Sequence, residues 1–355
     1  MRLLFLLVLS TVSALPQRGC QDFRIPVSVQ MTTTNEFVNQ TYNAEILYAL
    51  ASKQILVSNS YEISARLCLP QVQSNQGRGN SLQLLVHGAT FNKNMWDIQN
   101  EPEKYSWVRR MSNEGYPTLA IDLVGNGNST FPDGLLETQT QTYVEIVHQV
   151  IQKLRNGEVG GKRWTNIIMV GFSIGGITAN SLAQQYPKDV DTIVFHGISW
   201  DASWIYPAFL SGLQVPAQQA DPDKWGHLQS FYQTQSTREG RLVACFYGSY
   251  DPSMAEYDWL TRDFDTLGAA ITFTYHLVEA PAFKGPVFLG IGRSDSTFCG
   301  GEVCRDQPYA LYSRFPHAKA HDVKIYEETG HLILYHHSAQ QLMADTLGFL
   351  AAQGY

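Results

Sequence analysis

The chain has 355 residues, of which 44% are hydrophobic and 16% are charged. This composition supports a large buried core and excludes a disordered or collagen-like chain. The formal net charge of −7 at pH 7 lacks the basic excess with which proteins neutralise phosphates, so we expect no nucleic-acid partner. The length allows two domains, or one large α/β sheet with an insertion.

The N-terminus has the pattern of a secretory signal. Arg2 precedes an apolar block, and the tripeptide that ends at Ala14 is a small-residue cleavage pattern. The alternative is a membrane anchor, but the block is far shorter than the roughly 20 residues that a span needs, and no later stretch qualifies. We therefore expect residues 1–14 to be a signal peptide, and the protein to be secreted with no stable membrane span.

Two N-glycosylation sequons begin at Asn39 and Asn128, and export would make both of them possible glycosylation sites. Asn39 is the stronger of the two candidates. On this reading the protein is a glycoprotein.

Export would also place the five cysteines in an oxidising compartment, where pairing is favoured. Cys299 and Cys304 are close enough in sequence to close a short loop. A bond between Cys20 and Cys68 would tie the N-terminal segment to an early strand and leave Cys245 as a buried thiol, although the odd count leaves other pairings open. None of the spacings resembles a zinc site, and we expect no metal.

Short apolar runs alternate with segments of helical period beyond residue 80. The apolar positions between Val144 and Leu154 recur at helical spacing, and Asn156-Gly157 is a suitable helix stop. A second such segment, 342–350, predicts a closing helix. Six apolar runs are typical of buried parallel strands: 82–86, 119–123, 167–170, 192–195, 287–291 and 323–326. Strands that alternate with helices in this way predict a doubly wound α/β sheet.

Residues 198–284 interrupt this rhythm and are rich in aromatic side chains. They include Trp200, Trp204, Trp225 and Trp259. We interpret this segment as an inserted cap. Aromatic surfaces line many apolar ligand pockets, but these side chains would equally well fill a core within the segment, and both interpretations can hold together.

The strongest motif is Gly171-x-Ser173-x-Gly175, which lies between the strand 167–170 and a helix predicted over 177–185. A turn of this kind strains the backbone of its central serine and lifts the hydroxyl above the sheet, and the positions two residues away on either side must be small. A serine hydroxyl is a weak nucleophile at neutral pH. It needs a histidine within hydrogen-bond reach and a carboxylate that fixes the histidine tautomer.

With these features the chain resembles the α/β-hydrolase family. His87-Gly88-Ala89, after the strand 82–86, is similar to the family's oxyanion loop, and the segment from Asp122 to Ser129 is similar to its loop after the fourth strand. A serine at position 173, where family members that open epoxides or displace halide carry aspartate, favours acyl chemistry.

The resemblance covers the chain from about Leu82 to its end, apart from the insertion. It implies the α/β-hydrolase fold: a mostly parallel, doubly wound sheet with an inserted, largely helical cap. The expected division is a signal peptide (1–14), the first part of the core (15–197), the cap (198–284) and the second part of the core (285–355).

The resemblance also implies the chain order serine, acid, histidine. Asp295 follows the strand 287–291 and is similar in position to the family's acid, with Asp251 as the next candidate. His331 follows the strand 323–326 and precedes the last helix, which matches the family's histidine.

Other histidines fit less well. His321 precedes the strand, while His336 and His337 lie beyond the loop. The resemblance implies that His87 mainly supports the oxyanion loop.

The matching positions imply that the backbone amides of Ala89 and Ile174 form the oxyanion hole. The hydroxyl of Thr90 is an additional candidate donor.

We therefore expect a secreted serine hydrolase that cleaves an ester of a moderately hydrophobic small molecule or lipid through an acyl-enzyme, without a metal or organic cofactor. The same triad would serve an acyltransferase or a cyclising enzyme of small-molecule biosynthesis, and related proteins cleave amide, peptide or thioester bonds. A non-catalytic binding protein is a further alternative, which the intact serine, acid and histidine disfavour. The substrate itself is not encoded in any short motif.

Overall fold

A computed structural model describes residues 19–34, 54–70, 72, 76–212, 214–300 and 304–355. The expected signal peptide (1–14) and the Asn39 sequon lie outside the described residues. The expected sequon at Asn128 lies within them, and its asparagine is exposed.

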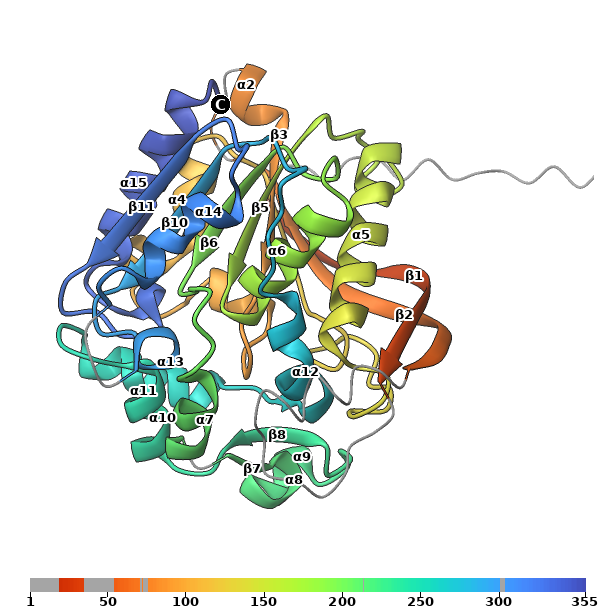
Figure 1. The fold of residues 1–355 in the computed structure, drawn as a ribbon, viewed down its shortest axis with the longest axis vertical. Coiled ribbons are helices and arrows are strands. Elements are labelled where there is room, and N and C mark those ends of the chain that lie inside the picture. Colours follow the sequence, from red (N-terminus) through yellow and green to blue (C-terminus); the bar gives the residue numbers. More distant parts are fainter. Residues whose placement is uncertain (1–18, 35–53, 71, 73–75, 213, 301–303) are drawn as a thin grey trace, which may run out of the picture.

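An eight-stranded sheet, in the order β1-β2-β4-β3-β5-β6-β10-β11, forms the centre of the described chain (Figure 1). The pairs from β4 to β11 are parallel, whereas β1 and β2 are antiparallel to each other and β2 is antiparallel to β4. The six predicted strands are all present, as β3 (Ser81–Val86), β4 (Thr118–Ile121), β5 (Asn166–Phe172), β6 (Thr192–His196), β10 (Val287–Gly292) and β11 (His321–Tyr326). This arrangement confirms the doubly wound, mostly parallel sheet.

The strand order reverses between β3 and β5, because the chain leaves β3 for β4 on one side and then returns to β5 on the other. In open α/β sheets, ligands bind in the crevice that such a reversal opens at the carboxyl ends of the strands. We therefore expect a ligand site in the loops after β3 and β5.

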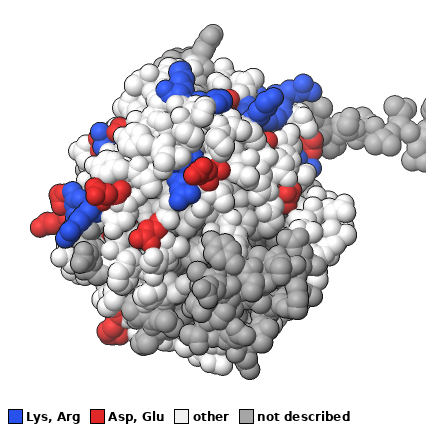
Figure 2. All heavy atoms as spheres, viewed as in Figure 1, with Lys and Arg blue, Asp and Glu red and all other residues white. Residues whose placement is uncertain are grey.

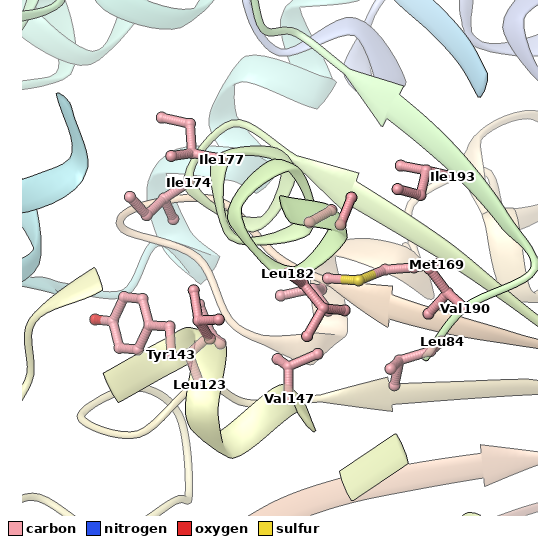
Figure 3. Close-up of a cluster of buried hydrophobic side chains, with 14 of the residues drawn as sticks. Leu84, Leu123, Tyr143, Val147, Met169, Ile174, Ile177, Leu182, Val190 and Ile193 are labelled. Carbon is pink, nitrogen blue, oxygen red and sulfur yellow. The ribbon is translucent and has the colours of Figure 1, made fainter. Parts of the chain in front are cut away.

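Two hydrophobic cores lie on opposite faces of the sheet. Alternate residues of β5 belong to different cores: Met169 to one and Ile168 to the other. The first core includes α5 (Thr140–Asn156) and α6 (Ile174–Gln185), and the second includes α4 (Trp107–Asn113) and α15 (Ala339–Ala352). Figure 3 shows side chains of the first core, with Val147, Leu182 and Met169 turned toward one another.

The predicted helix stop is observed at the end of α5. Gly157 has φ 79°, a left-handed conformation, and its N–H bonds to the carbonyl of Leu154. The predicted closing helix is α15, whose buried residues include Leu342, Leu347 and Leu350.

Strands β1 (Cys20–Thr34) and β2 (Gln54–Cys68) form a long antiparallel pair at the edge of the sheet, which the sequence analysis did not predict. Apolar side chains alternate along β1, and α5 packs against it. Cys20 lies opposite Cys68 in the register and is bonded to it, while Cys299 is bonded to Cys304. Cys245 is a buried free thiol, as expected.

The segment between β6 and β10 combines helices with a small sheet. Three short strands pair antiparallel in the order β7-β8-β9, a sheet that the sequence did not predict: β7 (Gln214–Pro216), β8 (Tyr232–Gln235) and β9 (Asp265–Thr266). The helices are α7 (Ile205–Ser211), α8 (Ala217–Ala220), α9 (Pro222–Trp225), α10 (Arg238–Cys245), α11 (Pro252–Thr261) and α12 (Leu267–Thr272), followed by the 3₁₀ turn η2 (Phe273–His276). The small sheet, α8 and α9 lie at the lower end of the molecule in Figure 1.

Several aromatic side chains of this segment fill cores. Trp225 packs edge-on against Phe264 in a small cluster within the segment, and Trp200 packs against Phe195 and Phe315 in the main core. Trp204, in contrast, is 42% exposed. Of the two interpretations of these aromatics, core filling accounts for Trp200 and Trp225.

Shorter helical turns complete the described chain: α2 (Gln76–Gly79), η1 (Lys93–Trp96), α3 (Pro102–Tyr105), α13 (Ser296–Cys299), η3 (Gln307–Ala310), α14 (Leu311–Arg314) and η4 (Ile333–Tyr335).

On the face shown in Figure 2, basic and acidic side chains lie close together in several places, and most of the remaining described surface carries neither. Among the described helices, none has both the length and the apolar composition needed to cross a bilayer.

Candidate active site

Ser173 occupies a strained turn between β5 and α6. Its backbone has φ 51° and ψ −118°, a conformation that residues with side chains rarely adopt. The turn is tight: a Cβ at Gly171 would lie 2.5 Å from the carbonyl oxygen of Gly175, and a Cβ at Gly175 would lie 2.2 Å from that of Val86. Both positions therefore require glycine.

Three side chains from distant parts of the sequence meet at this turn. His331 Nε2 lies 3.1 Å from Ser173 Oγ, and His331 Nδ1 lies 2.8 Å from Asp295 Oδ2. Asp295 follows β10 and His331 follows β11, so both lie at the same edge of the parallel sheet as Ser173. A carboxylate only accepts hydrogen bonds, so Nδ1 carries the proton and Nε2 is left to accept one from the serine hydroxyl.

The carboxylate of Asp295 is held on its other oxygen as well. Oδ1 accepts hydrogen bonds from the backbone N–H groups of Thr297 and Phe298, at 3.0 and 3.1 Å, as the cap of the short helix α13. Asp295 is fully buried, and His331 is 7% exposed. The Asp295 carboxylate is therefore fixed in position and shielded from water.

Asp251, the second candidate acid, is bound elsewhere. Its carboxylate accepts hydrogen bonds from Lys104 Nζ at 2.6 Å and from Tyr105 at 2.5 Å, and it lies 3.0 Å from His337 Nε2. The hydrogen bond from Lys104 holds the pKa of Asp251 well below its ordinary value. The structure thus brings Asp295, and not Asp251, to His331.

His336 has a role that the sequence analysis missed. Its Nε2 accepts hydrogen bonds from the backbone N–H groups of Gly330 and Tyr247, both at 3.2 Å, and its Nδ1 lies 2.8 Å from the carbonyl oxygen of Leu332. Burial lowers the pKa of His336 to about 4, so the ring is neutral and can accept these bonds. It binds the chain on both sides of His331 and so fixes this loop.

The two expected oxyanion donors lie at the reversal of strand order. Ala89 follows β3, and Ile174 is the first residue of α6, where helical N–H groups have no intrahelical partner. Among the described residues, neither amide donates a backbone hydrogen bond. Both therefore remain available to an incoming oxygen.

His87 orients the first of these donors. Its Nε2 accepts a hydrogen bond from the N–H of Leu123 at 2.9 Å, so its Nδ1 carries the proton and donates it to the carbonyl oxygen of Gly88 at 2.8 Å. That carbonyl belongs to the same peptide plane as the N–H of Ala89. Anchoring the carbonyl therefore fixes the direction of the amide.

Thr90 is not available as an additional oxyanion donor. Its hydroxyl donates to the carbonyl oxygen of Ala89 at 2.6 Å, so its single proton is already used.

A family model described as the alpha/beta hydrolase family matches residues 83–346. The chain belongs to the α/β-hydrolase family. The comparison with curated proteins gives no match.

Solved structures agree with this assignment. An alpha/beta hydrolase fold protein from Chitinophaga pinensis has a TM-score of 0.56 at 15% identity, covering 83% of this chain and 94% of its own. A probable hydrolytic enzyme from Pseudomonas aeruginosa has a TM-score of 0.54 at 17% identity, with 82% and 90% covered. A thermophilic esterase from Thermogutta terrifontis has a TM-score of 0.51 at 15% identity, with 82% and 94% covered. At these identities the similarity concerns the fold.

In this α/β hydrolase, the loop from Asp122 to Ser129 is bound by hydrogen bonds to the chain that follows the candidate oxyanion loop. The buried Asp122 carboxylate accepts hydrogen bonds from Lys93 Nζ at 2.7 Å, from the Lys93 N–H at 2.7 Å and from the Asn128 N–H at 3.0 Å. Ser129 closes the loop by donating to the carbonyl oxygen of Asp122 at 2.8 Å. The loop after β4 is thereby bound to the chain that follows Ala89.

Proposed function

We propose that this α/β hydrolase is a secreted serine hydrolase that cleaves carboxylic esters of moderately hydrophobic small molecules or lipids. The observation that carries the proposal is the unbroken chain of contacts from Asp295 through His331 to Ser173. Each contact falls on the ring nitrogen that the proposed proton transfer requires. The similarity in fold to a thermophilic esterase lends further support.

In the proposed mechanism, Ser173 Oγ attacks the ester carbonyl carbon while His331 Nε2 takes the hydroxyl proton. Asp295 keeps the ring in the required tautomer and stabilises the imidazolium. The charge that develops on the carbonyl oxygen is stabilised by the amides of Ala89 and Ile174, each worth about 2.7–4 kcal/mol in the transition state. His331 then protonates the departing alcohol, and water activated by His331 releases the acid.

The proposed preference for an apolar group rests on the surface beside the acid loop. Trp204 is 42% exposed, and its ring covers Gly300, directly after α13. Phe298, within α13, is buried with its ring 5.8 Å from that of His331, so α13 joins the Trp204 side of the loop to the candidate site. An apolar acyl or alcohol group would find the exposed aromatic surface of Trp204 on this side.

Secretion is supported by the two disulfides, since these bonds persist in oxidising compartments. It also agrees with the exposed Asn128 of the second sequon. N-terminal sequencing of the exported protein tests this part of the proposal: the mature chain is expected to begin after Ala14, and retention of residues 1–14 would contradict it.

Hydrolysis is tested with p-nitrophenyl esters of graded acyl length. The wild type should release acid and alcohol, and Ser173→Ala should lose this activity. Ser203→Ala, which removes an exposed serine, is the matched control and should keep the wild-type rate. Equal rates for Ser173→Ala and the wild type would refute the proposal.

Product analysis with added alcohols separates hydrolysis from acyl transfer, because transfer products would dominate in an acyltransferase.

A further inference from the structure

Thr90 holds a backbone conformation that its own side chain disfavours. Its φ is 62°, in the left-handed region, which is an outlier for a β-branched residue. Such a residue keeps this conformation only where surrounding contacts enforce it. Thr90 directly follows Ala89, so the contacts that hold Thr90 also shape the proposed oxyanion loop.

These contacts come from the segment between β6 and β10. Arg241 Nη1 donates to Thr90 Oγ1 at 2.6 Å across 151 residues of sequence, and the N–H of Asp263 donates to the Thr90 carbonyl at 2.9 Å. The guanidinium of Arg241 also lies 4.5 Å from the centre of the Phe91 ring. The insertion therefore contacts the oxyanion loop through both its side chains and its backbone.

Arg241 is itself held rigidly. Its Nε and Nη2 donate to the two carboxylate oxygens of Asp258, each at 2.7 Å, and its Nη1 also donates to Gln235 Oε1 at 2.8 Å. Arg241 is 1% exposed and Asp258 is fully buried. The two-point contact fixes the plane of the guanidinium, and with it the direction of the bond to Thr90. Burial of this ion pair removes water from both charges, and the cost of that desolvation offsets their attraction. The presence of the pair is therefore weak evidence that its role is only to stabilise the fold.

We propose that Arg241 is a positioning residue for the oxyanion hole, acting through Thr90 on the Ala89 amide. Arg241 donates to the Thr90 hydroxyl, which in turn donates to the Ala89 carbonyl, and this fixes the peptide after Ala89. His87 fixes the peptide before Ala89 by binding the Gly88 carbonyl. The oxyanion hole is then complete only while the insertion is packed against the core. This inference rests on the proposed function, since it assigns a role within the same site.

The test compares three variants. Arg241→Lys keeps the charge but lacks the fork that reaches Asp258 and Thr90 together. Thr90→Val removes only the hydroxyl while keeping the branched shape, and Thr90→Ser restores a hydroxyl. The matched control is Thr237→Ala, which removes the side-chain cap of α10, the helix that carries Arg241, without touching Thr90.

With an ester substrate, Arg241→Lys and Thr90→Val should each lower kcat by roughly 10- to 100-fold with little change in KM, because a displaced donor weakens the transition state more than the substrate complex. The double variant should fall no further than the single ones, since both changes remove the same hydrogen bond. Thr90→Ser should recover most of kcat, and Thr237→Ala should keep it despite a lower Tm. The inference is overturned if kcat of Thr90→Val equals that of the wild type, or if Thr237→Ala loses as much kcat as Arg241→Lys.

Hydrogen exchange of the peptide containing residues 87–92 tests positioning without relying on activity. Exchange there should be faster in Arg241→Lys and Thr90→Val than in Thr237→Ala, and equal exchange in all three would contradict the inference. A wild type that neither hydrolyses esters nor reacts with a serine-directed probe would instead contradict the proposed function.

Discussion

Asp295 Oδ2 lies 2.8 Å from His331 Nδ1, whereas the other ring nitrogen of His331, Nε2, faces Ser173. The second oxygen of Asp295 is bound by two backbone N–H groups, so the carboxylate has little freedom to turn away. This relationship distinguishes Asp295 from Asp251, the other carboxylate that the sequence offers as the acid.

Asp295→Asn should lower kcat for ester hydrolysis by about 10⁴-fold, because an amide NH₂ beside Nδ1 favours the wrong tautomer of His331. The amide oxygen can still accept from Thr297 and Phe298, so the fold should survive. Asp251→Asn serves as the control and should stay within about twofold of the wild type in kcat. A larger loss in Asp251→Asn than in Asp295→Asn would reverse the assignment of the acid.

Gly175→Ala should destabilise the protein by on the order of 3 kcal/mol, because the new Cβ would lie 2.2 Å from the Val86 carbonyl oxygen and 2.6 Å from that of His87. Gly348→Ala is the matched control: Gly348 is exposed within α15, and a Cβ there would meet nothing within 4 Å. This second change should stabilise by roughly 0.5–1 kcal/mol. Thermal unfolding followed by circular dichroism measures both, and a Tm for Gly175→Ala equal to that of the wild type would disagree with the tight turn.

Asp265 should make stability depend on pH. Burial raises the pKa of Asp265 to about 7, so the folded chain keeps this proton to a higher pH than the unfolded chain does. The free energy of unfolding therefore falls as pH rises from about 4 to about 7. Asp265→Asn removes this pH dependence. The free energy of unfolding of the variant should therefore rise relative to that of the wild type, by up to a few kcal/mol, as the pH increases from about 4 to about 7.

Urea denaturation at pH 4.5 and pH 7.5 measures this effect as the difference between variant and wild type at each pH. Asp223→Asn, at an exposed aspartate, should give the same difference from the wild type at both pH values. If Asp265→Asn behaves like Asp223→Asn, the predicted contribution of Asp265 is absent.

The parallel part of the fold could be predicted from sequence because its signals are local. Buried strands such as β3 and β10 are short apolar runs, and the turn at Ser173 requires glycine at fixed positions. The long β1–β2 pair also carried a local signal that was not used: Ile25, Val27, Val29 and Met31 alternate with exposed positions along β1. The strands of the small sheet, β7 to β9, are too short for a pattern of this kind.

The long-range contacts that position the candidate site could not be predicted from the sequence. Arg241 reaches Thr90 across 151 residues, and nothing in its local sequence distinguishes it from a surface arginine. Asp295 was the first candidate acid from its place after a predicted strand, but the two backbone N–H groups that hold its carboxylate were not predicted. His336, which looked like a residue beyond the active loop, is buried and holds that loop in place. Such roles arise from long-range packing and need coordinates.

The central claim is that Ser173 is an activated nucleophile, and labelling with a fluorophosphonate probe tests it most directly. Mass spectrometry of peptides from the labelled wild type should locate one adduct, on Ser173, because His331 activates this hydroxyl. Ser173→Ala should remain unlabelled under the same conditions, and Asp295→Asn should react far more slowly. A wild type that stays unlabelled where a known esterase reacts, or an adduct that persists in Ser173→Ala, would contradict the account.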